Sequence, residues 1–90
     1  MYNCFYKKAF IKDLTRIPKD YQPRIANLVL EKIPDSNDIF SDFDIVKMRG
    51  YSDYYRIRTG NYRIGCRIMS PDTIIFYRVV SREEIYKVFP

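Results

Sequence analysis

The stretch DYYRIRTGNYRIGCR, residues 53–67, decides the fold of this chain. Two runs of alternating side chains flank Gly60-Asn61, a dipeptide suited to a two-residue hairpin turn with glycine at its first central position. Such a turn sets Arg58 opposite Arg63. Because strand side chains alternate with period two, one face of the hairpin is apolar and the other carries almost only arginine. The apolar face comprises Tyr55, Ile57, Tyr62, Ile64, Cys66 and Ile68, and the opposite face comprises Tyr54, Arg56, Arg58, Arg63 and Arg67.

The arginine face predicts a partner of opposite charge. Like charges directly opposite each other destabilise a sheet, so Arg58 facing Arg63 favours a face that holds a polyanion. Residues 1–45 carry seven basic and seven acidic side chains, whereas residues 46–90 carry nine basic and four acidic ones and supply the net charge of +5. Arginine matches phosphate oxygens with two parallel hydrogen bonds, and the neighbouring tyrosines could stack on unpaired bases. The alternative is a solvated basic face with arginine stems packed over the sheet.

Length and composition limit the class of protein. The 90 residues predict a single domain, residues 1–90, and a hydrophobic fraction of 47% argues against disorder. No apolar run approaches the roughly 20 residues that span a bilayer, and the N-terminus lacks a signal-peptide pattern, so we expect a cytoplasmic protein without membrane contact. Cys4 and Cys66, without a CxxC spacing, are expected to be buried thiols. The absence of histidine excludes catalytic mechanisms that use Ser-His, Cys-His or paired histidines. No cluster of acidic residues lies near the arginines, so we expect neither a metal nor another cofactor.

The remaining elements follow from periodicity. Residues 7–17 and a helix that begins after Asp20 and closes at Pro34 have amphipathic spacing, which predicts a helical hairpin. Strands are expected at 2–6, 45–49, 54–58, 62–69 and 73–80. The run Thr73–Tyr77 does not alternate, which is typical of a strand buried on both faces. We therefore expect an α+β fold, with an N-terminal helical hairpin packed on a twisted antiparallel sheet of about four strands.

The C-terminal segment, residues 81–90, predicts one further helical turn. Ser81 is followed three residues later by Glu84, which is the pattern of a capping box. A helical turn at this point sets Arg82 and Tyr86, four residues apart, on one face near the arginines.

The whole chain, and most specifically its C-terminal half, resembles a known family. The motifs KMRG (47–50), DYYRIR (53–58), GNYRI (60–64) and REEIY (82–86), in this order after two helices, are similar to those of the RelE toxins in the RelE/ParE superfamily of toxin–antitoxin systems. The resemblance implies a small α+β fold, cleavage of messenger RNA in the ribosomal A site, and restraint by an antitoxin. The partners it implies are the cognate antitoxin, the ribosome with its message, and promoter DNA bound through the antitoxin.

The resemblance also carries site residues onto this sequence. It implies catalytic roles for Arg56 and Arg58 before the turn, Arg63 after it, and Arg82 and Tyr86 near the C-terminus. The best-known members have lysine at the positions of Arg56 and Arg58, and since arginine cannot lose a proton the general base stays open.

Each catalytic candidate has an expected role in cleavage by a ribose 2′-hydroxyl. Arg58 and Arg63 are expected to clamp the scissile phosphate, with Arg56 on a flanking phosphate. Arg82 is expected at the leaving 5′ oxygen, and Tyr86 as a stacking platform or as base. Further RNA contacts are expected from Lys47, which is also a secondary candidate for proton transfer, and from Arg49, Tyr54 and Arg67.

Two other functions fit the same residues. One is a ParE-like toxin that binds DNA gyrase without RNA chemistry, and the other is a non-catalytic module that binds RNA or the ribosome. The complete set of arginines with Tyr86 favours the ribosome-dependent endoribonuclease, since a protein that only binds its target does not need these groups gathered at one place. A weak acid–base set predicts poor cleavage of free RNA, which a ribosome that orients the message would correct.

Overall fold

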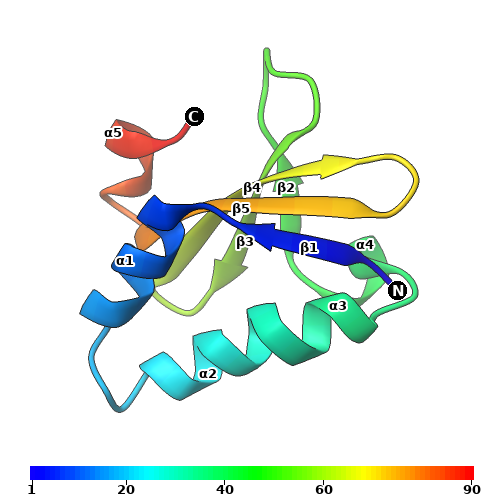
Figure 1. Cartoon of the computed structure of the whole chain (residues 1–90). Helices are drawn as coiled ribbons and strands as arrows, with labels where there is room; N and C mark the ends of the chain where they lie inside the picture. The colour runs from blue at the N-terminus through cyan, green and yellow to red at the C-terminus, as the bar shows by residue number, and fades with distance from the viewer.

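A five-stranded sheet lies at the centre of the computed structural model, which describes residues 1–90 (Figure 1). The strands are β1 (Asn3–Tyr6), β2 (Ile45–Lys47), β3 (Tyr54–Thr59), β4 (Tyr62–Met69) and β5 (Thr73–Ser81). Their order across the sheet is β1-β5-β4-β3-β2, with β1 parallel to β5 and the other pairs antiparallel. The mixed α+β class predicted from the sequence is thus confirmed.

The predicted register of the central hairpin is confirmed. Arg58 lies opposite Arg63 and Arg56 opposite Gly65. Gly60 has φ +58°, and Asn61 does not share this left-handed conformation, so only the first central turn position requires glycine. A side chain at Gly60 would also overlap the hydroxyl of Tyr21, which donates a hydrogen bond to the Thr59 carbonyl at 3.2 Å.

Six helical segments accompany the sheet. They are α1 (Lys8–Arg16), α2 (Gln22–Asn27), the π-helical segment η1 (Leu28–Lys32), α3 (Ile33–Asp35), α4 (Ile39–Asp42) and α5 (Ile85–Val88). The segments from α2 to α3 follow one another without a break, and Pro34 lies inside this run rather than ending it. Proline lacks an N–H and crowds the preceding turn, and the wider π-helical turns before Pro34 accommodate it. Asp20 does not cap α2, which begins at Gln22 without a side-chain cap.

The predicted sheet of about four antiparallel strands is wrong, and the predicted helical hairpin is not confirmed. The sheet has five strands, and β1, which the sequence predicted as a strand, pairs in parallel with β5. The main contacts of α1 are with β5: the Phe10 and Phe76 rings are tilted with centroids 5.4 Å apart, and Asp13 accepts a hydrogen bond from Arg78. Its contact with α2 includes the hydrogen bond that Gln22 Nε2 donates to the Leu14 carbonyl at 2.8 Å. In Figure 1 the run from α2 to α3 lies on one side of the sheet and α5 lies on the other.

The two faces of the sheet differ in what covers them. The inner face, towards the run from α2 to α3, holds the main core. Its fully buried side chains include Phe10, Ile25, Val29, Ile33, Ile57, Ile64, Cys66, Ile74, Phe76 and Val79. The outer face holds a smaller cluster of Met48, Ile85 and Phe89 beneath α5. Because α5 has only four residues, it leaves Ile75 and Tyr77 partly exposed, so the expectation that this strand is buried on both faces is wrong.

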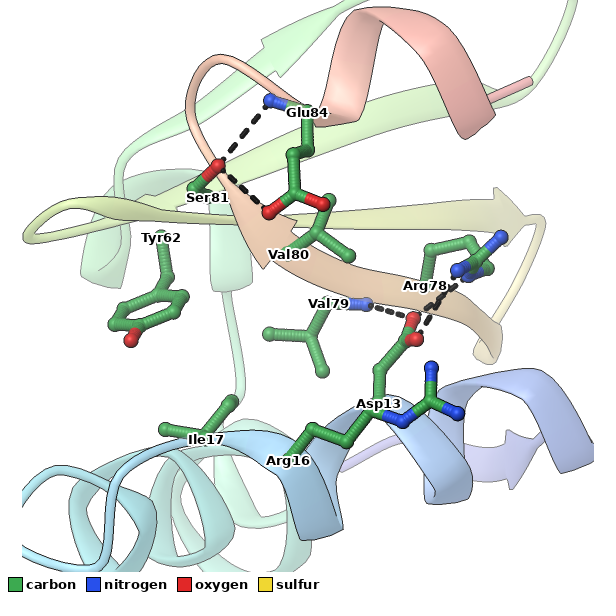
Figure 2. A pocket seen from close by; sticks show the side chains of 9 residues that line it. All are labelled: Asp13, Arg16, Ile17, Tyr62, Arg78, Val79, Val80, Ser81 and Glu84. Carbon is green, nitrogen blue, oxygen red and sulfur yellow. Dashed lines mark hydrogen bonds and ion pairs between the residues drawn. The ribbon is translucent and has the colours of Figure 1, made fainter.

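A buried carboxylate accepts hydrogen bonds from the part of β5 that lies beyond the end of β1 (Figure 2). Asp13 of α1 is 5% exposed and accepts hydrogen bonds from Arg78 Nε at 2.7 Å, Arg78 Nη2 at 3.0 Å and the backbone N–H of Val79 at 3.1 Å. These bonds raise the pKa of Arg78 above its ordinary value. They fix α1 against the sheet, beside a pocket of about 240 Å³.

Candidate functional site

Three of the predicted arginines and Tyr86 line one cavity on the outer face. This cavity, which we call the arginine groove, has a volume of about 160 Å³. Its lining residues are Val46, Arg56, Arg58, Arg63 and Tyr86. Val46, which the sequence analysis did not select, is half exposed and forms its only apolar aliphatic wall.

Cross-strand pairing explains why these residues converge. Arg58 and Arg63 are partners across β3 and β4, and Val46 and Arg56 are partners across β2 and β3. Directly opposite residues share a face, so all four side chains project outwards from adjacent strands. Tyr86 comes from α5, which crosses back over this face.

Arg58 and Arg63 are held by different contacts. Arg58 Nε lies 2.8 Å from a carboxylate oxygen of Asp44, with both side chains about half exposed, and the Arg58 backbone N–H donates to the Asp44 carbonyl at 2.9 Å. Arg63 Nη1 donates to the carbonyls of Gly60 and Tyr62, both at 2.9 Å. Each guanidinium therefore keeps further N–H groups that can bind an anion.

Arg56 is the arginine of the groove with a buried donor that lacks a partner, a property that it shares with Arg67 outside the groove. Its Nε is buried without a hydrogen-bond partner, and its guanidinium carbon lies 4.4 Å from the ring centroid of Tyr86. The cation–π contact stabilises the charge but supplies no acceptor. A buried donor without an acceptor costs free energy in the folded state. The Tyr86 side chain is 70% exposed, which leaves its ring available to a second planar group.

Several predicted residues lie outside the groove. Arg82 is exposed and pairs with Glu83 at 3.2 Å, which lowers the pKa of Glu83, and its backbone N–H bonds the Asn61 carbonyl beside the turn. Lys47 is the partner of Tyr55, whose ring packs on the main core, so Lys47 lies on the inner face and not beside the arginines. Arg49 is exposed in the loop after β2.

Tyr54 and Arg67 form a separate group on the outer face. The Arg67 guanidinium lies 5.1 Å from the ring centroid of Tyr54, and its Nη2 is 3.6 Å from a carboxylate oxygen of Asp53. The Tyr54 ring also packs against Tyr77 and Phe89, at centroid distances of 6.1 and 5.6 Å. Tyr54 is therefore part of a packed aromatic cluster and does not line the groove.

The structure contains no group of three or more cysteine or acidic side chains placed to hold a metal ion. None of the helices combines the length and apolar character that crossing a bilayer requires. The burial of the thiols raises the pKa of Cys4 to about 11 and that of Cys66 further, so neither is a ready nucleophile.

This small α+β fold is shared with a family of toxins. The chain belongs to the ParE toxin family of type II toxin–antitoxin systems, whose family model matches residues 5–86. The predicted resemblance to RelE toxins is confirmed as well. Toxin RelE3 of Methanocaldococcus jannaschii is 46% identical over 86 residues, which cover 94% of this chain and 96% of the relative.

Solved structures agree with this assignment. A RelB-RelE antitoxin–toxin complex from Methanococcus jannaschii contains a chain with a TM-score of 0.77 and 45% identity, covering 96% of this chain and 99% of that one. The archaeal RelE-RelB complex from Pyrococcus horikoshii OT3 gives a TM-score of 0.62 at 27% identity, covering 90% and 94%.

Proposed function

We propose that this toxin is a metal-independent endoribonuclease that cleaves messenger RNA in the ribosomal A site. The observation that carries the proposal is the arginine groove, in which Arg56, Arg58 and Arg63 meet Tyr86. Three guanidinium groups around one small cavity suit a phosphodiester, and an exposed aromatic ring beside them suits an unpaired base.

The reaction is a transfer within the RNA strand. The 2′-oxygen attacks the adjacent phosphorus and loses its proton, while the bond from phosphorus to the 5′ oxygen breaks and that oxygen gains a proton. The products are a 2′,3′-cyclic phosphate and a free 5′-hydroxyl. Arg58 and Arg63 stabilise the charge that develops on the phosphate oxygens, and Arg56 binds a neighbouring phosphate.

Tyr86 orients the RNA by stacking a base on the exposed side of its ring, while Arg56 occupies the other side. The groove offers no side chain other than Tyr86 that can exchange a proton, since arginine keeps its proton. The protein thus supplies mainly electrostatic stabilisation, and the ribosome supplies the in-line geometry. This division explains why we expect cleavage of free RNA to be slow.

We also assign the protein a cognate antitoxin as its partner. The related chains from Methanococcus jannaschii and Pyrococcus horikoshii were solved as complexes with RelB. An acidic antitoxin segment would complement the basic half of this chain. Binding of promoter DNA through the antitoxin remains a prediction of the family resemblance.

The test is primer extension on a defined message, with and without programmed ribosomes, for the wild type, Arg63→Ala and Arg24→Ala. Arg24 is an exposed arginine on α2 that stacks over Tyr21, so its removal matches the loss of charge without touching the groove. We expect ribosome-dependent cleavage that falls by about 10²–10³ in Arg63→Ala, by analogy with the loss of one oxyanion donor, and that persists in Arg24→Ala.

Two outcomes would refute the proposal. Equal losses in both variants would show that overall charge, and not the groove, drives cleavage. Growth arrest by a protein that cleaves nothing, with or without ribosomes, would favour the gyrase-directed function instead.

A further inference from the structure

The C-terminal helix α5 is too short to hold itself in place. It has four residues, and an isolated helix of that length is not stable in water. Its position comes from two buried side chains on the outer face of the sheet: Ile85, its first residue, at 0% exposure and Phe89, directly after its last residue, at 4%. Both belong to the small cluster with Met48, so α5 is fixed by packing.

Phe89 occupies a space that exists because residue 65 has no side chain. A Cβ built on Gly65 would overlap the Phe89 ring, with Cδ1 at 2.8 Å and two further ring carbons closer still. Gly65 has no positive φ, so alanine suits its backbone and only the contact with Phe89 opposes it. Gly65 is also the cross-strand partner of Arg56, which sets this notch beside the groove.

Tyr86 has little contact of its own to determine where it lies. Its side chain is 70% exposed and rests on the guanidinium of Arg56. Tyr86 follows Ile85 directly and precedes Phe89 by three residues. The ring can therefore lie over Arg56 only when these two neighbours are seated on the sheet.

We infer that Gly65 and Phe89 are positioning residues that hold Tyr86 over Arg56 and so complete the arginine groove. The Phe89 side chain packs into the notch at Gly65, and this contact fixes the position of α5. The position of α5 in turn determines where the Tyr86 ring lies. The consequence for RNA cleavage rests on the proposed function, whereas the placement of Tyr86 can be measured without it.

The experiment compares Gly65→Ala, Phe89→Ala and the double variant. The first readout is the NMR resonance of the Arg56 Nε–H group, identified by its loss in Arg56→Lys, because a proton close to an aromatic ring is shifted by the ring current. We expect this resonance to move towards its position in Tyr86→Leu in all three variants. Adding Gly65→Ala to Phe89→Ala should change nothing more, since the ring with which the new methyl collides is already gone.

The second readout is ribosome-dependent cleavage. A displacement of about 1 Å in a reacting group costs on the order of 10²-fold in rate, so we expect a loss of this size in Gly65→Ala, mainly in kcat. Ile25→Val, a change in the core on the opposite face, is the control for reduced stability and should leave both readouts unchanged.

The outcomes separate this inference from the proposed function. An unchanged Arg56 resonance in Gly65→Ala or Phe89→Ala overturns the inference, whatever happens to cleavage. A shifted resonance in a protein whose wild type cleaves nothing supports the inference and contradicts the proposed function. If Gly65→Ala does not fold, Phe89→Ala alone decides.

Discussion

Replacement of Asp13 by alanine should destabilise the fold more than any exposed charge removal. The carboxylate accepts two hydrogen bonds from Arg78 and one from the Val79 N–H, and it is 5% exposed. Asp13→Ala leaves a guanidinium without its counter-ion and a buried backbone N–H without an acceptor. In the unfolded chain water binds both groups, whereas in the folded variant neither group has a partner, so the folded state is destabilised.

The magnitude follows from these two groups. Removing one partner of a buried ion pair costs about 3–5 kcal/mol, but the Arg78 side chain is 29% exposed and water compensates part of the loss. We therefore assign about 2 kcal/mol to the charge and about 1 kcal/mol to the orphaned N–H. A loss near 3 kcal/mol corresponds to a fall of about 12–24 °C in Tm for a chain of this size.

The assay is chemical denaturation of the wild type, Asp13→Ala, Asp13→Asn and Asp20→Ala. Asp13→Asn keeps an acceptor for the Val79 N–H but loses the charge, so it should lie between the wild type and alanine. Asp20 is exposed and has no side-chain hydrogen bond or ion pair, which makes Asp20→Ala the control. The reasoning is refuted if Asp13→Ala lowers the free energy of unfolding no more than Asp20→Ala does.

Three further predictions concern the turn, the stability at high pH and the buried thiol of Cys66. Gly60→Ala should lower the free energy of unfolding by at least about 1–2 kcal/mol because alanine disfavours φ +58°, and it should cost less in a Tyr21→Phe background, where the overlapping hydroxyl is absent. Equal costs in the two backgrounds, measured by denaturation, would contradict the role of the overlap. Burial raises the pKa of Cys4 from 9.0 to about 11 and that of Tyr6 from 10.0 to about 12, so the folded state keeps both groups neutral. Their contribution to stability should be complete below about pH 9 and should disappear between about pH 9 and pH 12. A Tm that stays constant over this window would contradict it, and Cys66 should resist alkylation at pH 8 unless the protein unfolds.

The hairpin could be predicted from sequence because its determinants are local. The turn at Gly60-Asn61 fixes the register, and the register fixes which side chains share a face. The turn before α5 is also local: the Glu84 backbone N–H donates to the Ser81 hydroxyl at 3.2 Å, as the capping box predicts. The Glu84 carboxylate accepts from the Ser81 hydroxyl at 3.1 Å instead of from the Ser81 backbone N–H, and α5 begins only at Ile85. No distant residue is needed to specify either feature.

The errors arose where distant parts of the chain decide. The pairing of β1 with β5 joins residues about 70 positions apart, and no periodicity within Asn3–Tyr6 specifies a parallel neighbour. The π-helical turns of η1 place Pro34 inside a helix, whereas a local rule ends the helix there.

The candidate site divides in the same way. Arg56, Arg58 and Arg63 could be grouped from strand alternation alone. The spacing in the terminal turn predicted both Arg82 and Tyr86 near them, but only Tyr86 lines the groove. Lys47 could not be placed, because its face depends on the pairing of β2 with β3. Gly65 carried no chemical signal in the sequence, since its role lies in the space that it leaves for Phe89.

The carboxylate of Asp13 also limits how this sheet can grow. Every strand edge offers rows of N–H and C=O groups to which another chain can add, and β5 would offer such an edge beyond the end of β1. With the Val79 N–H already bonded to Asp13, a further strand cannot pair there without displacing α1. Any chain that extends the sheet must join it at β1 or at the three-residue strand β2, at opposite ends of the molecule.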